Sequence, residues 1–128
     1  MFSNEIEVVT LFVDDIGAAR QFYENVFRPQ IIYQDDVSAV LKFSGTLINL
    51  LQASEAPELV TPLAVAASGS GTRMLLTIKV ENVDAVCTEL TKRGATILNG
   101  PIDRPWGRRT AAFADPSGHV WEVAQEIA

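Results

Sequence analysis

The sequence has very little of what disulfide frameworks and transition-metal sites require. Its 128 residues include one cysteine, Cys87, and one histidine, His119. A single cysteine excludes an internal disulfide framework and a thiolate metal cluster, and it fits a reducing cytoplasm. Cys87 falls on the apolar side of an expected helix, so we predict that it is a small buried hydrophobic residue.

Long apolar runs and basic residues are also scarce. No stretch approaches the ~20 apolar residues that a membrane helix needs, and the first residues lack the pattern of a signal peptide. We therefore expect a cytoplasmic protein that does not bind membranes. Ten Lys and Arg residues stand against 16 Asp and Glu residues, which gives a net charge of −6. This balance argues against a nucleic-acid partner; it suits a neutral or cationic ligand, or serves solubility alone.

The residues that are present alternate between strand and helix patterns. We expect strands at about 8–13, 30–34, 37–43, 46–53, 74–80, 95–99, 108–114 and 120–124. Two helices should follow Asp15 and Asn82, whose side chains suit the first position before a helix. Residues 54–72, rich in proline, glycine and small side chains, should form a connector with a possible short helix at 59–67, and residues 100–107 should form a loop.

The last two strands flank a tight turn, Asp115-Pro116-Ser117-Gly118. One carboxylate, Glu122, lies inside the otherwise apolar strand that follows. An unpaired buried charge is costly. Glu122 therefore points to solvent, pairs with an arginine such as Arg108 or Arg109, or has a function.

The two halves of the chain match one another. Residues 8–16 align with residues 75–83 without a gap, and residues 46–52 align with residues 119–125. Each half therefore reads strand, helix, strand, strand, strand. We expect one domain at 1–128, with a first module at about 5–53, the connector at 54–72 and a second module at about 73–126.

In these features the chain resembles the vicinal oxygen chelate superfamily, which includes glyoxalase I, bleomycin-resistance proteins and extradiol dioxygenases. The resemblance rests on residues 11–15 and the following residues 19–23, on the Pro105-Trp106-Gly107 corner, and on the 115–118 turn four residues before Glu122. The resemblance implies an α+β fold in which two βαβββ modules form a curled mixed sheet around one cavity. It also implies a homodimer.

Metal-using members of that family hold one divalent ion with four residues, typically a histidine on the first strand of each module and a carboxylate on the last. The matching positions here are Val8, Asn49, Leu75 and Glu122. Val8 and Leu75 have no donor atom, and one amide with one carboxylate falls short of a zinc or iron site. His119 should lie on the face opposite Glu122, as a solvated turn residue. We therefore expect no metal and no other cofactor.

Successive side chains of a strand point to opposite faces, so these four positions also predict which neighbouring residues would contact a ligand. If Val8 and Leu75 face inward, so do their neighbours at every second position, and the opposite set, which is almost wholly apolar, packs under the helices. Trp106 is added because loop aromatics often stack on ligands; it could equally pack the corner of the fold. The candidate ligand-binding residues are Thr10, Phe12, Asn49, Leu51, Thr77, Lys79, Trp106 and Glu122.

Three functions fit these patterns. The first is a binding protein of the bleomycin-resistance type that uses no metal and sequesters an apolar or cationic small molecule. The alternative is a glyoxalase- or dioxygenase-like enzyme with an atypical site, in which Glu122, the only candidate catalytic residue, acts as general base. The third is a scaffold or dimerisation module without a ligand.

Overall fold

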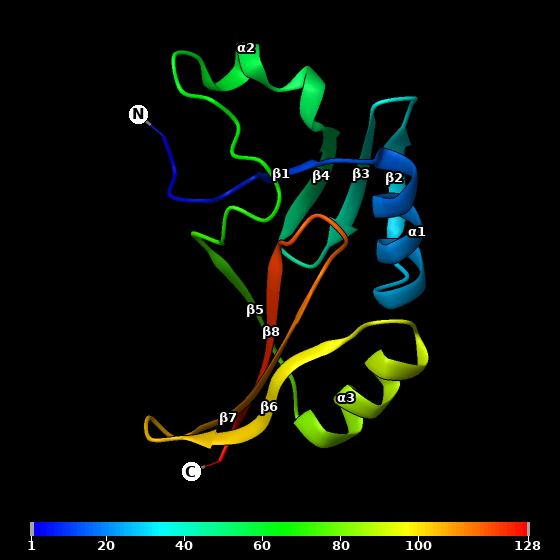
Figure 1. Ribbon diagram of the computed structural model, residues 1–128. Coiled ribbons are helices and arrows are strands. Elements are labelled where there is room, and N and C mark those ends of the chain that lie inside the picture. The colour runs from blue at the N-terminus through cyan, green and yellow to red at the C-terminus, as the bar shows by residue number, and fades with distance from the viewer. Residues whose placement is uncertain (1, 128) are drawn as a thin grey trace. The chain divides into compact units, whose positions relative to one another are not determined.

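The protein is described by a computed structural model that covers residues 2–127 (Figure 1). The chain divides into two compact units with the boundary between Ser68 and Gly69, and we call these the first and second modules.

Each module has the order strand, helix, strand, strand, strand. The first contains β1 (Val8–Val13), α1 (Ile16–Val26), β2 (Gln30–Gln34), β3 (Ser38–Phe43) and β4 (Thr46–Gln52), followed by a short 3-10 helix, η1 (Ala53–Glu55), and α2 (Pro57–Val60). The second contains β5 (Leu75–Lys79), α3 (Val83–Lys92), β6 (Ile97–Arg104), β7 (Arg108–Ala114) and β8 (Val120–Glu126).

The two sheets have the same mixed topology. Their strand orders are β1-β4-β3-β2 and β5-β8-β7-β6. In each, the first strand of the module pairs in parallel with the last, and the remaining neighbours are antiparallel. Two βαβββ modules in an α+β fold are confirmed.

One face of each sheet packs against the helix of its own module. In the first module Leu11, Val13 and Leu50 are fully buried, together with Tyr23 of α1. In the second, Trp121 and Val123 of β8 are buried with Cys87 of α3, as the sequence predicts. Each large side chain removed from water in this way contributes about 1.5–3 kcal/mol. These apolar faces hold the helices on the sheets.

In both modules the start of the helix is held by two side chains, one from the residue that precedes the helix and one from a glutamine of the last strand. Asp15 accepts from the amide of Ala18, and Asn82 accepts from the amide of Ala85. The glutamine near the end of the module's last strand adds a longer contact. Gln52 Oε1 accepts from the Ile16 amide at 2.9 Å, and Gln125 Oε1 accepts from the Val83 amide at 2.9 Å. The internal repeat therefore extends to individual hydrogen bonds.

Two expectations about irregular segments are wrong. The short helix in the connector is α2 at Pro57–Val60, not 59–67, because Pro57 suits the first turn of a helix and Pro62 follows it closely. The expected loop at 100–107 belongs largely to β6, which continues to Arg104. The pairing of β6 with β7 shifts between Asn99 and Ile102.

Gly100 explains how β6 continues through this shift. Its φ is +82°, and a Cβ there would stand 2.3 Å from the carbonyl oxygen of Thr110. Only glycine tolerates both the backbone conformation and the close approach. The glycine and proline at 100–101 therefore mark a bulge in a strand rather than a loop.

No helix within residues 2–127 is long and apolar enough to cross a membrane.

Candidate functional site

The face of each sheet that the helix leaves uncovered carries most of the candidate residues. In the first module Thr10, Phe12, Asn49 and Leu51 are half-buried on β1 and β4. Thr10 lies directly beside Asn49, and Phe12 directly beside Leu51. We call this surface the open face of the first module.

Thr10 and Asn49 are joined by a side-chain hydrogen bond. Asn49 Nδ2 donates to Thr10 Oγ1 at 3.3 Å. Within residues 2–127 the amide oxygen of Asn49 accepts no hydrogen bond. This pair is the polar centre of a surface that is otherwise largely apolar.

The open face of the second module has its polar pair at the matching positions. Thr77 on β5 lies beside Glu122 on β8, and Thr77 Oγ1 donates to Glu122 Oε1 at 3.0 Å. On the other side Glu122 lies opposite Ala112 of β7. The carboxylate therefore stands between a threonine and a small, buried alanine, and it is half-buried.

Glu122 is not paired with either of the arginines considered from the sequence. Arg108 Nη2 binds Glu126 at 2.8 Å. Arg109 binds Asp84 at 2.8 Å and Asp103 at 3.0 Å on the helix side of the sheet. The hydrogen bond from Arg109 lowers the pKa of Asp84, and the two carboxylates together raise the pKa of Arg109. Both arginines are thus already neutralised by other carboxylates.

Lys79 and Trp106 lie farther from this pair. Lys79 is exposed two positions after Thr77 on the same face, and in the part of the chain that the structure describes it makes no ion pair with Glu122. Trp106 is 67% exposed in the turn between β6 and β7. Arg108, which follows that turn, lies opposite Glu126, and Glu126 is roughly 13 Å from Glu122 along β8. The turn lies beyond Arg108, farther still from Glu122. Within the module, Trp106 and Glu122 are not brought together.

His119 differs from the expectation of a solvated turn residue. Its Nδ1 lies 2.7 Å from Oδ2 of the buried Asp115, and its backbone amide donates to Oδ1 of the same carboxylate at 2.8 Å. The other end of the turn is held as well, since the Ser117 amide donates to Asp115 Oδ1. The half-buried ring of His119 therefore helps to fix the turn that precedes β8.

Sequence reasoning missed a second polar group on the open face of the second module. Arg104 donates from Nε to Thr110 Oγ1 at 2.9 Å and from Nη2 to Asn99 Oδ1 at 3.1 Å. Asn99 lies opposite Ala112, which lies opposite Glu122. Alternation along residues 108–114 would have placed Thr110 and Ala112 on this face. The interpretation of residues 100–107 as a loop concealed Arg104.

The donor atoms do not fit the family's metal. In the first module Val8 has no donor and Asn49 offers one amide oxygen; in the second Leu75 has no donor and Glu122 offers one carboxylate. Across residues 2–127 no group of three or more His, Cys, Asp or Glu side chains is arranged to hold an ion. Zinc and iron enzyme sites use about three such donors, so these residues fall short of such a site.

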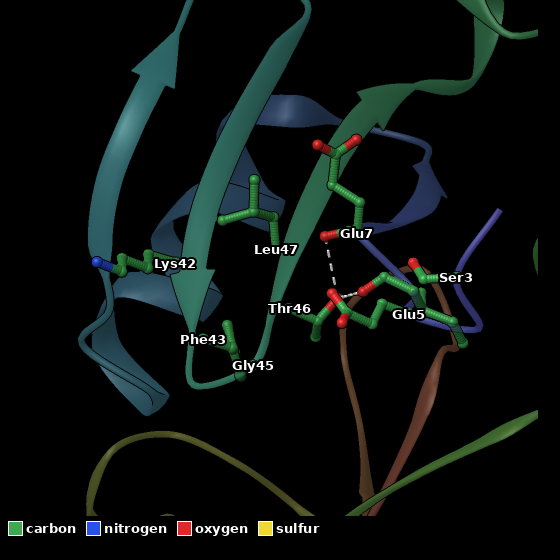
Figure 2. Close-up of a pocket in the computed structure, with 9 residues that line it drawn as sticks. Ser3, Glu5, Glu7, Lys42, Phe43, Gly45, Thr46 and Leu47 are labelled. Carbon is green, nitrogen blue, oxygen red and sulfur yellow. Dashed lines mark hydrogen bonds between the residues drawn. The ribbon is translucent and has the colours of Figure 1, made fainter.

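A cavity of about 650 Å³ adjoins the open face of the first module. It lies where the segment before β1 passes the turn between β3 and β4 (Figure 2). Thr46 Oγ1 donates to the carbonyl oxygens of Ile6 and Glu7 and so holds that segment in place. Its lining is Ser3, Glu5, Ile6, Glu7, Lys42, Phe43, Gly45, Thr46 and Leu47.

The cavity combines carboxylates with apolar walls. Glu5 and Glu7 come from the segment before β1, whereas Phe43 and Leu47 come from the hairpin. In Figure 2 the ammonium group of Lys42 points away from both carboxylates. Leu47 lies two positions before Asn49 on β4, and so on the same face. The sequence pattern does not predict this cavity, because four of its lining residues precede the first expected strand, which begins at residue 8.

Comparisons with known proteins agree with this architecture. The profile of the Glyoxalase/Bleomycin resistance protein/Dioxygenase superfamily matches residues 5–123. A glyoxalase/bleomycin resistance protein/dioxygenase from Nocardioides superposes with a TM-score of 0.87 at 22% identity, over 99% of this chain and 86% of that one. TnmS3, an antibiotic binding protein from Streptomyces sp. CB03234, superposes with a TM-score of 0.71 at 26% identity, over 98% of each chain.

A curated relative is an enzyme. The metallothiol transferase FosB of Staphylococcus saprophyticus is 25% identical over 118 residues, which cover 92% of this chain and 74% of that protein. The profile match spans nearly the whole repeat, and both modules have the expected strand order. The chain therefore belongs to the glyoxalase/bleomycin resistance/dioxygenase superfamily, also called the vicinal oxygen chelate superfamily.

Proposed function

We propose that this protein binds a small apolar or cationic molecule on the open faces of its modules and sequesters it, in the manner of the bleomycin-resistance branch and without a metal. The observation that carries the proposal is Glu122. It is a half-buried carboxylate on a sheet face, its hydrogen-bonding partner is the neutral Thr77, and it lies beside the small Ala112. A ligand with an ammonium or N–H group can form a charged hydrogen bond with such a carboxylate, which is stronger than a hydrogen bond between neutral groups.

One oxygen of Glu122 is free for this role. Oε1 accepts from Thr77, whereas Oε2 has no hydrogen-bond partner within residues 2–127. No polar side-chain atom in that range is both buried and unbonded, so Oε2 is accessible from outside the protein. A ligand can therefore reach the carboxylate without displacing Thr77.

The cavity of the first module supports the same chemistry. Carboxylates of Glu5 and Glu7 line it together with the apolar side chains of Ile6, Phe43 and Leu47. Apolar walls with a few polar groups are typical of small-molecule sites. The net charge of −6 favours a cation over an anion at long range.

The similarity to TnmS3 adds support, because that protein is an antibiotic binding protein and is matched over almost its whole length. FosB supports a second candidate, since it is a transferase. In that case the free oxygen of Glu122 would act as general base toward a bound substrate. We favour binding because, of the four positions equivalent to the family's metal ligands, Glu122 alone is a carboxylate, which is too few donors for a metal-dependent enzyme of this family.

A thermal-shift screen of small aromatic and cationic compounds tests the proposal, with each hit located by amide chemical shifts. We expect hits that perturb the amides around Thr77, Glu122 and Ala112, or those around Thr10 and Asn49. Hits confined to surfaces away from both open faces, or a complete absence of hits, would reject the proposal. A hit that is chemically altered on incubation, with turnover lost in Glu122→Gln, would establish the enzyme instead.

A further inference from the structure

Arg104 has an unusual set of partners among the arginines of the second module. Its Nε donates to the hydroxyl of Thr110 and its Nη2 to the amide oxygen of Asn99. Both acceptors are neutral. In contrast, Arg108 and Arg109, on the neighbouring strand β7, each bind at least one carboxylate.

The environment of Arg104 makes the missing counter-ion significant. Arg104 is half-buried, and Thr110 beneath it is 1% exposed. A half-buried guanidinium is stabilised by an anion, and its planar set of donors suits a carboxylate or another oxyanion. Nη1 has no hydrogen-bond partner among residues 2–127, and no side-chain nitrogen or oxygen there is both buried and without a hydrogen bond. That nitrogen is therefore accessible.

Arg104 and Glu122 lie on the same face of one sheet. Across the strands β8, β7 and β6 the register places Glu122 opposite Ala112, and Ala112 opposite Asn99. The guanidinium of Arg104 is bound to Asn99 at one end of this row, and Glu122 stands at the other. Two strand spacings separate Glu122 from Asn99, which is roughly 10 Å.

The row between the two charges carries only small side chains. Ala112 is a buried alanine, and Ala124, two positions after Glu122 on β8, is also buried. Neither side chain extends beyond a methyl group. No large side chain of this row therefore stands between the acid and the base, and within residues 2–127 no ion pair connects them.

We propose that the ligand of this open face is dipolar: it carries a cation or hydrogen-bond donor that meets Glu122 and a carboxylate or similar oxyanion that meets Arg104, with a body that spans the distance between them. Arg104 is then a specificity-determining residue of the site. The inference rests on the proposed function, because it uses the same surface and the same carboxylate. It narrows the ligand from apolar or cationic compounds to compounds that bear both charges.

A matched set of four probes tests the proposal. 4-(Aminomethyl)benzoate carries both groups, 4-methylbenzoate lacks the ammonium, 4-(aminomethyl)benzamide lacks the carboxylate, and 4-methylbenzamide lacks both. Amide chemical-shift titrations of the full chain give an affinity for each probe and locate it. Arg104→Gln and Glu122→Gln are compared with Arg73→Gln, a control at an exposed arginine of the same module.

We expect the wild type to bind 4-(aminomethyl)benzoate about tenfold or more tightly than each probe that lacks one group, the factor that a charged hydrogen bond supplies. Arg104→Gln should abolish the preference for carboxylate over carboxamide and keep the preference for the ammonium. Glu122→Gln should do the reverse, and Arg73→Gln should change neither. Arg104→Lys, which keeps the charge but not the planar donors, should retain part of the carboxylate preference.

Three results would overturn the inference: equal wild-type affinity for the benzoate and the benzamide, a carboxylate preference that survives Arg104→Gln, or no binding of any probe at the row from Thr77 to Asn99. If the compound screen still yields cationic hits that depend on Glu122, the proposed function stands while this inference fails. If no compound in either experiment perturbs an open face, both fail together.

Discussion

Thr77 donates a hydrogen bond to Glu122, and the equivalent pair in the first module is reversed, with Asn49 donating to Thr10. A carboxylate can only accept, so Glu122 fixes the direction of the hydroxyl of Thr77. An asparagine has a donor and an acceptor, so Asn49 satisfies Thr10 and keeps an oxygen free. The two modules thus hold related pairs with different charge at matching positions.

Replacing Glu122 with glutamine should show whether its carboxylate takes part in ligand binding. For a ligand that donates to the carboxylate, we expect Glu122→Gln to weaken binding by about 1.5–3 kcal/mol. Stability should change by less than about 1 kcal/mol, because glutamine can still accept from Thr77 and the site is half-exposed. Calorimetry and thermal unfolding measure the two effects. Glu81→Gln, an exposed acid of the same module, is the control, and equal affinity in both variants would remove Glu122 from the site.

Replacing Gly100 with alanine should destabilise the second module. The new Cβ would meet the Thr110 carbonyl oxygen at 2.3 Å in a backbone conformation with φ of +82°. We expect a loss of about 3 kcal/mol or more in the free energy of unfolding. Gly107→Ala isolates the backbone contribution, because Gly107 has φ of +84° but no atom within 4 Å of the added Cβ. A cost no larger than that of Gly107→Ala in denaturant unfolding would contradict the close approach.

Asp35 should contribute to stability at moderate but not at strongly acidic pH. Hydrogen bonds from the Val37 amide, the Tyr33 hydroxyl and Ser38 lower its pKa from 3.8 to about 2. A lowered folded-state pKa means that its contribution is complete above the unfolded value, near 3.8, and is lost as the pH falls through about 2. Melting temperatures between pH 5 and pH 2 should therefore fall less steeply in Asp35→Asn than in the wild type. Asp36→Asn should behave like the wild type; identical slopes in all three proteins would exclude the effect.

Metal content provides a prediction that needs no ligand. Protein purified without added ions should contain far less than one equivalent of zinc, nickel, manganese or iron, because Val8 and Leu75 supply no donor atom. Elemental analysis measures this directly. Stoichiometric metal that a chelator removes, with loss of an activity, would reject the binding-protein proposal.

The open faces also lead us to expect a homodimer at micromolar concentration. Val8 and Leu75 are 37% and 49% exposed on these faces, and apolar surface of this kind is commonly covered by a second subunit in a two-fold contact. Light scattering should report about twice the 13.9 kDa of one chain. A monomer at every accessible concentration would contradict this expectation.

Local patterns were sufficient to predict the repeat and the buried faces. Apolar residues occur at every second position of the strands and at helical spacing after Asp15 and Asn82. This spacing predicts which face of each strand and helix is buried. The match of Thr46–Gln52 with residues 119–125 placed Asn49 and Glu122 at equivalent positions. These features depend on neighbours along the chain, which a single sequence displays.

Predicting that Arg104 lies on the open face of the second module required knowledge of a contact that the sequence does not display. Gly100 and Pro101 have the composition of a loop, and only the close approach of Thr110 shows that they form a bulge. Once β6 is extended through them, Arg104 falls on the face of Glu122. The role of His119 was missed for a related reason, since the partner that buries it, Asp115, was interpreted only as a turn residue.

The glutamines that bind the helix starts have a consequence for how each module opens. The first amides of a helix have no partner within it and normally exchange with solvent readily. Here the amides of Ile16 and Val83 are bound by Gln52 and Gln125, which arrive from the far end of the same module. Their exchange requires the hydrogen bond between the last strand's glutamine and the helix start to break, so each amide reports local opening within one module. Hydrogen exchange at these two positions would show whether the modules open together or one at a time.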